Sequence, residues 1–510
     1  MSEGAQVLQH DTHDKQLVQH VHPPGWKNPT AKDRYHIVVI GAGTGGLVTA
    51  AGAAGLGAKV ALIERHLMGG DCLNVGCVPS KGVISAARSW HRAQRSHDDF
   101  GGPAVSGSGN FAAAMERMRR LRAGIAHNDG AERFSSLGID VFLGQGTFID
   151  PTTIEIGGQT LAFRRAVIAT GARAAAPKIE GLDKVQYLTN ESIFTLTELP
   201  ARLLVIGSGP IGCEMAQAFA RLGSQVTVFE RGPEIMPRED KDAAAIVRRS
   251  MERDGVVFEC RTKLLSVEQQ GQQTIVHYEQ DGQRRSRAGE KLLVAIGRAP
   301  NVEGLGLDRA GVAFDDKGVT VDRYLRTTNS RVYAVGDICS PYKFTHTADA
   351  QARIVIQNAL FDGIPLGLAM KKHELIVPWA TYTSPEVAHV GMYEQDAAKA
   401  GIEFDTVTVS LEHVDRAILE GENEGFLRVL VRKGTDKIVG ATLVAEHAGE
   451  MISELTLAMK AGIGLGTIAA TIHPYPTQAE VIRKAGDAFN KTKLTARTKK
   501  ILGFMLRVFS

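Results

Sequence analysis

Short, continuous runs of apolar residues recur along the first two thirds of the chain, and each ends in glycine. They begin at residues 37, 166, 203, 292 and 332. Runs of this kind are typical of strands buried on both faces of a parallel sheet. Helical patterns of small residues follow the first and third runs, which predicts an α/β fold.

The pattern changes after about residue 375. Residues 425–432 alternate between apolar and polar positions, as a half-buried strand does, and residues 450–461 have the spacing of an amphipathic helix. This part of the chain predicts a separate C-terminal α+β domain.

The first apolar run leads into a glycine-rich turn, Gly41-x-Gly43-x-x-Gly46, and the next predicted strand ends in Glu64. Gly41 permits the tight turn, Gly43 lets a pyrophosphate approach the start of the helix, and Gly46 lets helix and strand pack. Glu64 can accept a hydrogen bond from a ribose 2′-OH. Strand, turn, helix and acid in this order predict a dinucleotide site.

The same order of elements returns over residues 203–230. Its glycines and acid are Gly207, Gly209, Gly212 and Glu230. The acid follows the first glycine by 23 positions in both units, so the sequence predicts two dinucleotide sites of one plan. Glu230 favours NADH because a carboxylate repels a 2′-phosphate, although the nearby Arg231 and Arg238 leave NADPH open.

Two cysteines, Cys72 and Cys77, lie five positions apart behind a glycine pair. A helix is predicted to begin after Cys77, where backbone N–H groups lower the pKa of a thiol. Lys81 lies four residues further on and therefore shares a helix face with Cys77. The pair alone is equally consistent with two buried free cysteines, and the neighbouring motifs favour a redox function.

Composition narrows the class of protein. A net charge of +3 on 510 residues gives no reason to expect nucleic acid binding. Five cysteines do not form a secreted disulfide framework, and neither a secretory signal nor an apolar run of about 18 residues is present. We expect a cytoplasmic enzyme of several domains.

Both ends of the chain differ from the rest. Residues 1–34 are polar with irregularly spaced histidines, and we expect a partly ordered leader without a function. Residues 487–510 are basic and then apolar. We favour a helix packed on its own subunit there, with weak contact to an anionic membrane surface as the alternative.

Several segments together resemble the class I pyridine nucleotide–disulfide oxidoreductases, the family of glutathione reductase, dihydrolipoamide dehydrogenase and mercuric reductase. The segments are GGDCLNVGCVPSK, both glycine turns, ATGA, VAIGRAPN, YAVGD and YTSPEVAHVG. The likeness covers about residues 35–485. It implies two Rossmann-like dinucleotide-binding domains plus a C-terminal α+β dimerisation domain.

The resemblance also implies a division of the chain and an assignment of residues. The segments would be an arm (1–34), FAD-binding (35–185), NAD(P)-binding (186–300), second FAD-binding or central (301–373), dimerisation (374–486) and tail (487–510). FAD would be held by the first glycine turn and Asp337, and the nicotinamide nucleotide by the second turn. Further cofactor-binding positions would be Gly70, Gly171 and Gly297.

In this family electrons pass from nicotinamide to flavin, then to the disulfide, and then to an acceptor. By resemblance, Cys77 would be the thiol next to the flavin and Cys72 the outer, exchanging thiol. Lys81 would pair with Glu214 near flavin N5. The other three cysteines, Cys213, Cys260 and Cys339, are predicted to be structural.

The acceptor end departs from most of the family. Its disulfide reductases resemble one another in a C-terminal His-Pro-Thr-x-x-Glu, whose histidine serves the partner subunit. Aligning Pro-Thr-x-x-Glu onto this chain puts Tyr475 in the histidine position, with Glu480 at its end. Tyrosine is a poor proton shuttle near neutral pH, because its reference pKa is about 10 against about 6.5 for histidine. His473, two residues earlier, is an alternative acid.

Tyrosine at this place resembles mercuric reductase. Two thiolates, Cys72 and Cys77, suit a soft metal ion as acceptor, and no other metal ligand is predicted. The N-terminal Cys-x-x-Cys domain and the C-terminal vicinal cysteines of mercuric reductases do not occur in this sequence. We expect a mercuric-reductase-like homodimer with a shared active site. The alternatives are a dihydrolipoamide or other disulfide reductase, and a redox-sensing or membrane-docked flavoprotein.

Overall fold

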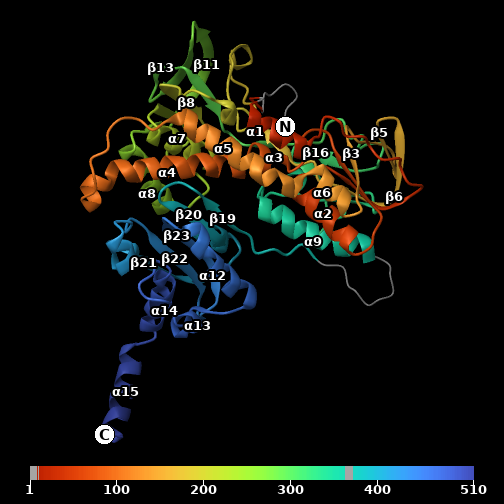
Figure 1. Ribbon diagram of the computed structural model, residues 1–510. Helices are drawn as coiled ribbons and strands as arrows, with labels where there is room; N and C mark the ends of the chain where they lie inside the picture. The colour runs from red at the N-terminus through yellow and green to blue at the C-terminus, as the bar shows by residue number, and fades with distance from the viewer. Residues whose placement is uncertain (1–7, 10, 362–371, 510) are drawn as a thin grey trace. The chain divides into compact units, whose positions relative to one another are not determined.

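The computed structural model describes residues 8, 9, 11–361 and 372–509 (Figure 1). The chain divides into two compact units, each made of three stretches of sequence. Unit 1 comprises Met1–Gln94, Val105–Phe229 and Thr262–Leu375, and unit 2 comprises Arg95–Ala104, Glu230–Arg261 and Ile376–Ser510.

The largest sheet of unit 1 is built around β1, which lies between β2 and β6 and is parallel to both. Its strands are β1 (Tyr35–Ile40), β2 (Val60–Glu64), β3 (Asp140–Leu143), β4 (Thr147–Asp150), β5 (Thr153–Ile156), β6 (Gln159–Ile168) and β18 (Val332–Ala334). Ile37 and Val39 of β1 face a core shared with α2 (Thr44–Gly55) and α9 (Thr345–Phe361). Burial of both faces explains the continuous apolar run at β1.

A second parallel sheet in unit 1 contains the second glycine turn. There β8 (Arg202–Ile206) lies between β9 (Gln225–Phe229) and β14 (Lys291–Val294), and α7 (Pro210–Arg221) connects β8 to β9. Antiparallel strands complete the unit: β11 (Lys263–Gln270) with β12 (Gln273–Gln280) and β13 (Gln283–Gly289), β7 (Ala172–Ala174) with β15 (Arg298–Pro300), and β16 (Phe314–Asp315) with β17 (Gly318–Val319).

Unit 2 contains an antiparallel sheet of five strands in the order β19-β20-β23-β22-β21. They are β19 (Pro378–Thr381), β20 (Glu386–Gly391), β21 (Phe404–Ser410), β22 (Phe426–Arg432) and β23 (Ile438–Ala445). Leu427 and Val429 of β22 share a core with Leu455 and Val481. The helices of unit 2 are α8 (Lys241–Arg253), α10 (Glu394–Lys399), α11 (Asp415–Leu419), α12 (Ala448–Ala461), α13 (Leu465–Ala470), α14 (Glu480–Thr492) and α15 (Ala496–Val508).

These elements confirm the predicted α/β class with two Rossmann-like units and a C-terminal α+β part. The helix after Asp337, α9, begins at Thr345 and has no acidic residue in its first turn.

The described part of residues 1–34 contains a packed helix, whereas we expected a leader without a function. Residues Thr12–Val21 form α1, whose N-cap Asp11 accepts a hydrogen bond from the N–H of Asp14. Leu17 and Val21 are fully buried against the core of unit 1. Residues 1–7 and His10 lie outside the described residues.

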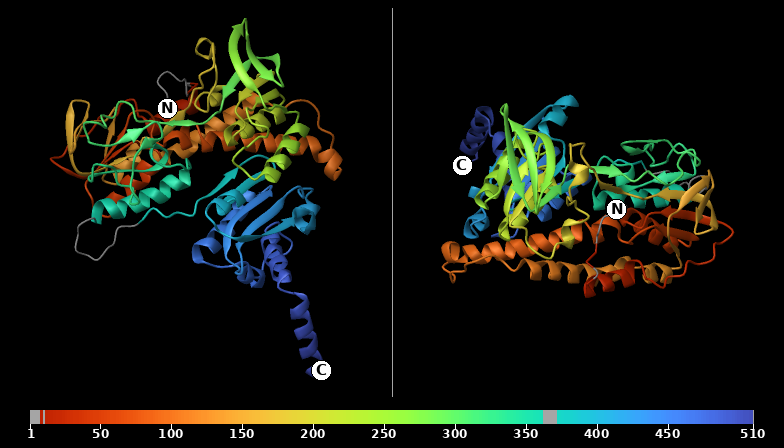
Figure 2. Two further views of the ribbon diagram at one scale, coloured as in Figure 1. Left: turned by 180° about the vertical axis from the view of Figure 1, so that it is seen from behind. Right: turned by 90° about the horizontal axis from the view of Figure 1, so that it is seen from above.

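The C-terminal tail does form a helix, but not the packed one that we favoured. α15, dark blue in Figure 2, contains no buried residue within the described chain. Among the described residues, no helix is long and apolar enough to cross a membrane.

Candidate active site

The two cysteines of the redox motif lie on two consecutive helices of unit 1. Cys72 is in α3 (Gly70–Asn74), and α4 (Cys77–Phe100) begins at Cys77. Gly70 has a φ of +58°, and a Cβ there would lie 2.7 Å from the Cα of Gly43, so only glycine fits. Both cysteines are free thiols, Cys72 half-buried and Cys77 exposed.

The two thiols ionise differently because they interact with each other. Their hydrogen bond is the largest influence on both groups, lowering the pKa of Cys77 and raising that of Cys72. Thr345, the first residue of α9, has its Oγ1 3.5 Å from Cys77 Sγ and lowers the pKa of Cys77 further. Cys77 is therefore the thiol that ionises first.

Lys81 and Glu214 are brought together as the resemblance implied. Lys81 Nζ lies 2.8 Å from Glu214 Oε2, which joins α4 to α7. The cation of Lys81 lowers the pKa of Cys77, and the carboxylate of Glu214 raises it. The pair thus changes the pKa of Cys77, which lies one helical turn before Lys81.

The first glycine turn has the shape that a pyrophosphate needs. Gly41 has a φ of +101°, and a Cβ there would lie 2.4 Å from the carbonyl oxygen of Ala169. A Cβ on Gly46 would lie 1.8 Å from the carbonyl oxygen of Gly41. In the described chain no side chain caps α2 at Gly43, so its first N–H groups can bind phosphate oxygens.

Glu64 lies at the end of β2, beside this turn. Its two carboxylate oxygens accept hydrogen bonds from the N–H groups of Ala42, at 2.7 Å, and His66, at 2.8 Å. Burial raises the pKa of Glu64, and these hydrogen bonds oppose the rise. The remaining lone pairs suit a ribose hydroxyl, so the residues present fit a dinucleotide.

The second glycine turn repeats this geometry. A Cβ on Gly212 would lie 2.0 Å from the carbonyl oxygen of Gly207, and α7 begins after Gly209 with Pro210 at its first position. No side chain in the described residues caps α7. Glu230 directly follows β9, and its Oε1 accepts a hydrogen bond of 2.7 Å from the N–H of Gly232. The second glycine turn therefore also fits a pyrophosphate.

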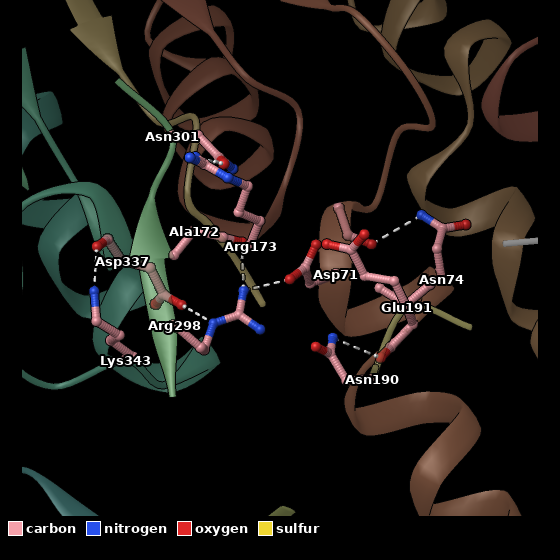
Figure 3. Close-up of polar contacts among 12 residues, drawn as sticks. Asp71, Asn74, Ala172, Arg173, Asn190, Glu191, Arg298, Asn301, Asp337 and Lys343 are labelled. Carbon is pink, nitrogen blue, oxygen red and sulfur yellow. Dashed lines mark hydrogen bonds and ion pairs between the residues drawn. The ribbon is translucent and has the colours of Figure 1, made fainter. Parts of the chain in front are cut away.

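Sequence reasoning missed Arg298, which lies between two acids of unit 1 (Figure 3). Arg298 pairs with the carboxylate of Asp71, and its Nε lies 3.2 Å from Asp337 Oδ2. Its Nη2 also donates to the carbonyl oxygen of Ala172 at 2.6 Å. Asp71 directly precedes Cys72, so Arg298 links the redox motif to the expected flavin residue Asp337.

Two further predicted positions flank Arg298. Gly171 follows β6 and Gly297 precedes β15, and both have positive φ, +67° and +136°. The adjoining strands β7 and β15 pair in antiparallel register. An arginine directly after Gly297 was the available signal, but its acidic partners are 39 and 227 positions away, beyond the reach of local patterns.

A buried network connects the N-terminal helix to the redox motif. Asp14 and Arg122 form an ion pair of 2.6 Å in which each side chain is 1% exposed. Arg122, on α5 (Phe111–Ile125), also donates to the carbonyl oxygen of Asn74 at 2.7 Å. Asn74 lies between the two cysteines and donates to the carbonyl oxygens of Met68 and Gly70. The arm expected to have no function thus supports this loop.

The residues predicted at the acceptor end lie in unit 2. Tyr475 is 69% exposed, and its hydroxyl donates to Asp415 Oδ2 at 2.9 Å, which raises the pKa of Tyr475. His473 Nε2 lies 3.0 Å from Glu454 Oε1. Glu480 is buried and pairs with Arg483 at 2.7 Å. Tyr475 therefore contacts α11, whereas His473 contacts α12.

Among the described residues, no group of three or more histidine, cysteine or acidic side chains is placed to hold a metal ion. Cys72 and Cys77 interact with each other. A soft metal ion would thus meet two sulfur ligands here rather than a complete resident site.

Comparison with known proteins agrees with this geometry. The family model for pyridine nucleotide-disulphide oxidoreductases matches residues 35–352, and the model for the dimerisation domain of that family matches residues 377–486. The chain is 36% identical over 459 residues to a mercuric reductase of Bacillus cereus, covering 90% of this chain and 72% of the relative. It is 33% identical over 474 residues to a dihydrolipoyl dehydrogenase of Thermus scotoductus, covering 90% and 98%.

A solved structure has the same fold. The Cu(II) complex of the HOCl-induced flavoprotein disulfide reductase RclA from Escherichia coli superposes with a TM-score of 0.79 at 27% identity, covering 89% of this chain and 99% of that one. The chain therefore belongs to the pyridine nucleotide-disulphide oxidoreductases. It is an oxidoreductase of a family that uses FAD and NAD(P)H, and it carries the dimerisation domain of that family.

Proposed function

We propose that this protein passes an electron pair from NADH through FAD to the Cys72–Cys77 disulfide and then to a soft metal ion or a thiol-bound acceptor, as a mercuric-reductase-like enzyme. The observation that carries the proposal is the pair of coupled thiols, with Cys77 ionising first and the Lys81–Glu214 ion pair one turn away. This is the arrangement that a two-electron sulfur relay needs.

When bound, FAD supplies the transfer of an electron pair between a hydride donor and a disulfide. Two electrons and one proton break the S–S bond and leave a thiolate on Cys77 and a thiol on Cys72. The cation of Lys81 stabilises that thiolate, and Asp337, Glu64 and the first glycine turn would hold the flavin nucleotide. A metal ion bound by sulfur is reduced without protonation of a leaving thiol, so Tyr475 need not supply a proton.

The finer assignments belong to the same proposal. Glu230 supports NADH over NADPH, because a carboxylate accepts from a free 2′-OH. We propose that residues 35–185 and 301–373 bind FAD, that residues 186–300 bind NAD(P)H, and that residues 374–486 form the dimer interface. In the homodimer, Tyr475 and Glu480 would complete the site of the partner. A cytoplasmic location belongs to the same proposal, because five cysteines do not form a secreted disulfide framework.

One contact favours a second candidate, a dihydrolipoamide or other disulfide reductase. His473 lies 3.0 Å from the carboxylate of Glu454, and a carboxylate that orients an imidazole is typical of general acid–base pairs. The two candidates differ in whether His473 must protonate a leaving thiolate.

Steady-state assays with NADH and three acceptors separate them: Hg(II) with excess thiol, lipoamide, and glutathione disulfide. The proposal predicts turnover with Hg(II) that exceeds turnover with either disulfide, and little effect of His473→Gln. Faster turnover with lipoamide that falls about 100-fold in His473→Gln would favour the second candidate.

A further inference from the structure

Helix α15 has two chemically different faces. Apolar residues occupy positions three and four apart and so form one wide stripe. They are Ile501, Leu502, Phe504, Met505, Leu506, Val508 and Phe509. Each is between 45% and 83% exposed. Lys499, Lys500 and Arg507 lie on the opposite face with Gly503, so the helix is amphipathic with a basic polar side.

The tail concentrates positive charge. From residue 488 to the end the chain has six lysines and arginines and no acid. Since the whole chain has a net charge of +3, the remainder is net acidic by three charges. The last acid, Asp487, pairs with Arg483 at 2.9 Å and does not offset the tail.

Helix α15 is short, and its N-terminus is capped. Thr495 caps it, accepting a hydrogen bond of 3.2 Å from the N–H of Thr498. Its 13 residues extend about 20 Å, less than the hydrocarbon thickness of a bilayer. A short helix with a basic face and an aromatic, leucine-rich face binds in the plane of a membrane interface.

We propose that α15 docks this protein on an anionic lipid surface, with the helix axis parallel to the bilayer. Lys499, Lys500 and Arg507 would contact acidic headgroups, and the apolar stripe would enter the acyl boundary. Pairing between two copies of α15 is unfavourable because it would bring two strongly basic segments together. The tail also lies beyond residues 377–486, which match the dimerisation domain.

Sedimentation of the full-length protein with two kinds of vesicle tests this. One kind contains phosphatidylcholine alone, and the other adds phosphatidylserine. We expect binding to the anionic vesicles at least tenfold tighter, since each basic residue near an anionic surface contributes about fivefold. Binding should weaken strongly at about 1 M salt, where the Debye length is about 3 Å.

Matched variants separate charge from apolar contact. Lys499→Glu with Lys500→Glu should abolish the preference for anionic vesicles, and Phe504→Ser with Leu506→Ser should weaken binding to both kinds. Exposed controls elsewhere, Lys317→Glu and Leu137→Ser, should have no effect. NADH oxidase activity in solution should be equal in all variants.

Two results would overturn the proposal. One is equal sedimentation of the full-length chain and a chain ending at residue 486. The other is loss of the dimer in analytical ultracentrifugation on that truncation, without any vesicle binding by the full-length protein, which would assign α15 to the subunit interface.

Discussion

Lys81 Nζ and Glu214 Oε2, 2.8 Å apart, join the helix that begins at Cys77 to the helix that follows the second glycine turn. Glu214 is nearly buried, with 6% of its side chain exposed, whereas Lys81 is 37% exposed. Their influences on the pKa of Cys77 oppose each other: the cation lowers it and the carboxylate raises it. Lys81 therefore favours the thiolate form of Cys77, and Glu214 disfavours it.

Single substitutions of this pair should shift Cys77 in opposite directions. Lys81→Met should raise the pKa of Cys77, and Glu214→Gln should lower it, because each removes one of the two opposing charges. The pH dependence of iodoacetamide alkylation of the reduced protein, with the modified cysteine identified by mass spectrometry, measures both shifts. Lys59→Met, at an exposed position, is the control. Shifts of the same sign in both variants would contradict the account.

Thr345 should contribute through its hydroxyl. Thr345→Val keeps the shape of the side chain but removes the 3.5 Å contact with Cys77 Sγ, so the pKa of Cys77 should rise. Thiolate then accumulates only at higher pH. Thr345→Ser retains the hydroxyl and should leave the pKa near that of the wild type. The ultraviolet absorbance of the thiolate during a pH titration measures the difference.

Loss of Arg298 should weaken both folding and flavin retention. Arg298→Met leaves Asp71 and Asp337 without their shared cation. Because these side chains are 16–25% exposed, the cost should lie between the about 1 kcal/mol of an exposed pair and the about 3 kcal/mol of a buried one. Burial already raises the pKa of Asp337, and Arg298 opposes that rise. In Arg298→Met the pKa of Asp337 in the folded state should therefore rise further. The folding stability of the variant should then fall as the pH increases through the pKa of Asp337.

Denaturant unfolding across pH and the FAD-to-protein ratio measure these effects. Arg173→Met is the matched control, because Arg173 is on the paired strand and its partner Glu303 is 64% exposed. Equal loss of flavin in both variants would show that Arg298 has no particular role in flavin retention.

The buried pair at the N-terminus should be essential for stability. Asp14→Asn leaves the guanidinium of Arg122 buried without its counter-charge, which should cost about 3–5 kcal/mol of unfolding free energy. Chemical denaturation measures this cost, and Glu116→Gln, whose side chain is 66% exposed, should change stability by less than about 1 kcal/mol. An unchanged denaturation midpoint in Asp14→Asn would show that the arm is dispensable.

Tyr475→His should raise disulfide-reductase activity, because histidine titrates near neutral pH and tyrosine does not. The hydrogen bond to Asp415 moves the pKa of Tyr475 even further from neutrality. General acid catalysis contributes about 100-fold or more, so turnover with lipoamide or glutathione disulfide should increase measurably. Tyr475→Phe, which keeps the ring, should give no gain.

The sequence predicted the parts of this molecule that local patterns determine. Gly41, Gly46, Gly207 and Gly212 have spacings fixed by strand, turn and helix geometry, and the structure places each against the backbone as the pattern implies. The contact of Lys81 with Glu214 came from resemblance, since no local pattern joins residues 133 positions apart.

Long-range ion pairs account for what was missed. Asp14 with Arg122, and Arg298 with Asp71 and Asp337, are formed by residues that look like ordinary surface charges in the sequence. The leader seemed too polar to pack because few of its residues are apolar. In α1, however, Leu17 and Val21 are fully buried, and Asp14 finds a buried partner in Arg122.

Anaerobic titration of the purified protein with NADH tests the central claim, that the Cys72–Cys77 disulfide receives the electron pair from the flavin and leaves the thiolate on Cys77. We expect yellow protein that develops a long-wavelength charge-transfer absorbance on reduction. Cys72→Ser should show that absorbance before any NADH is added, because Cys77 is then a free thiolate, and Cys77→Ser should never show it. A protein that retains no flavin, or a Cys77→Ser variant with the wild-type absorbance, would contradict the account.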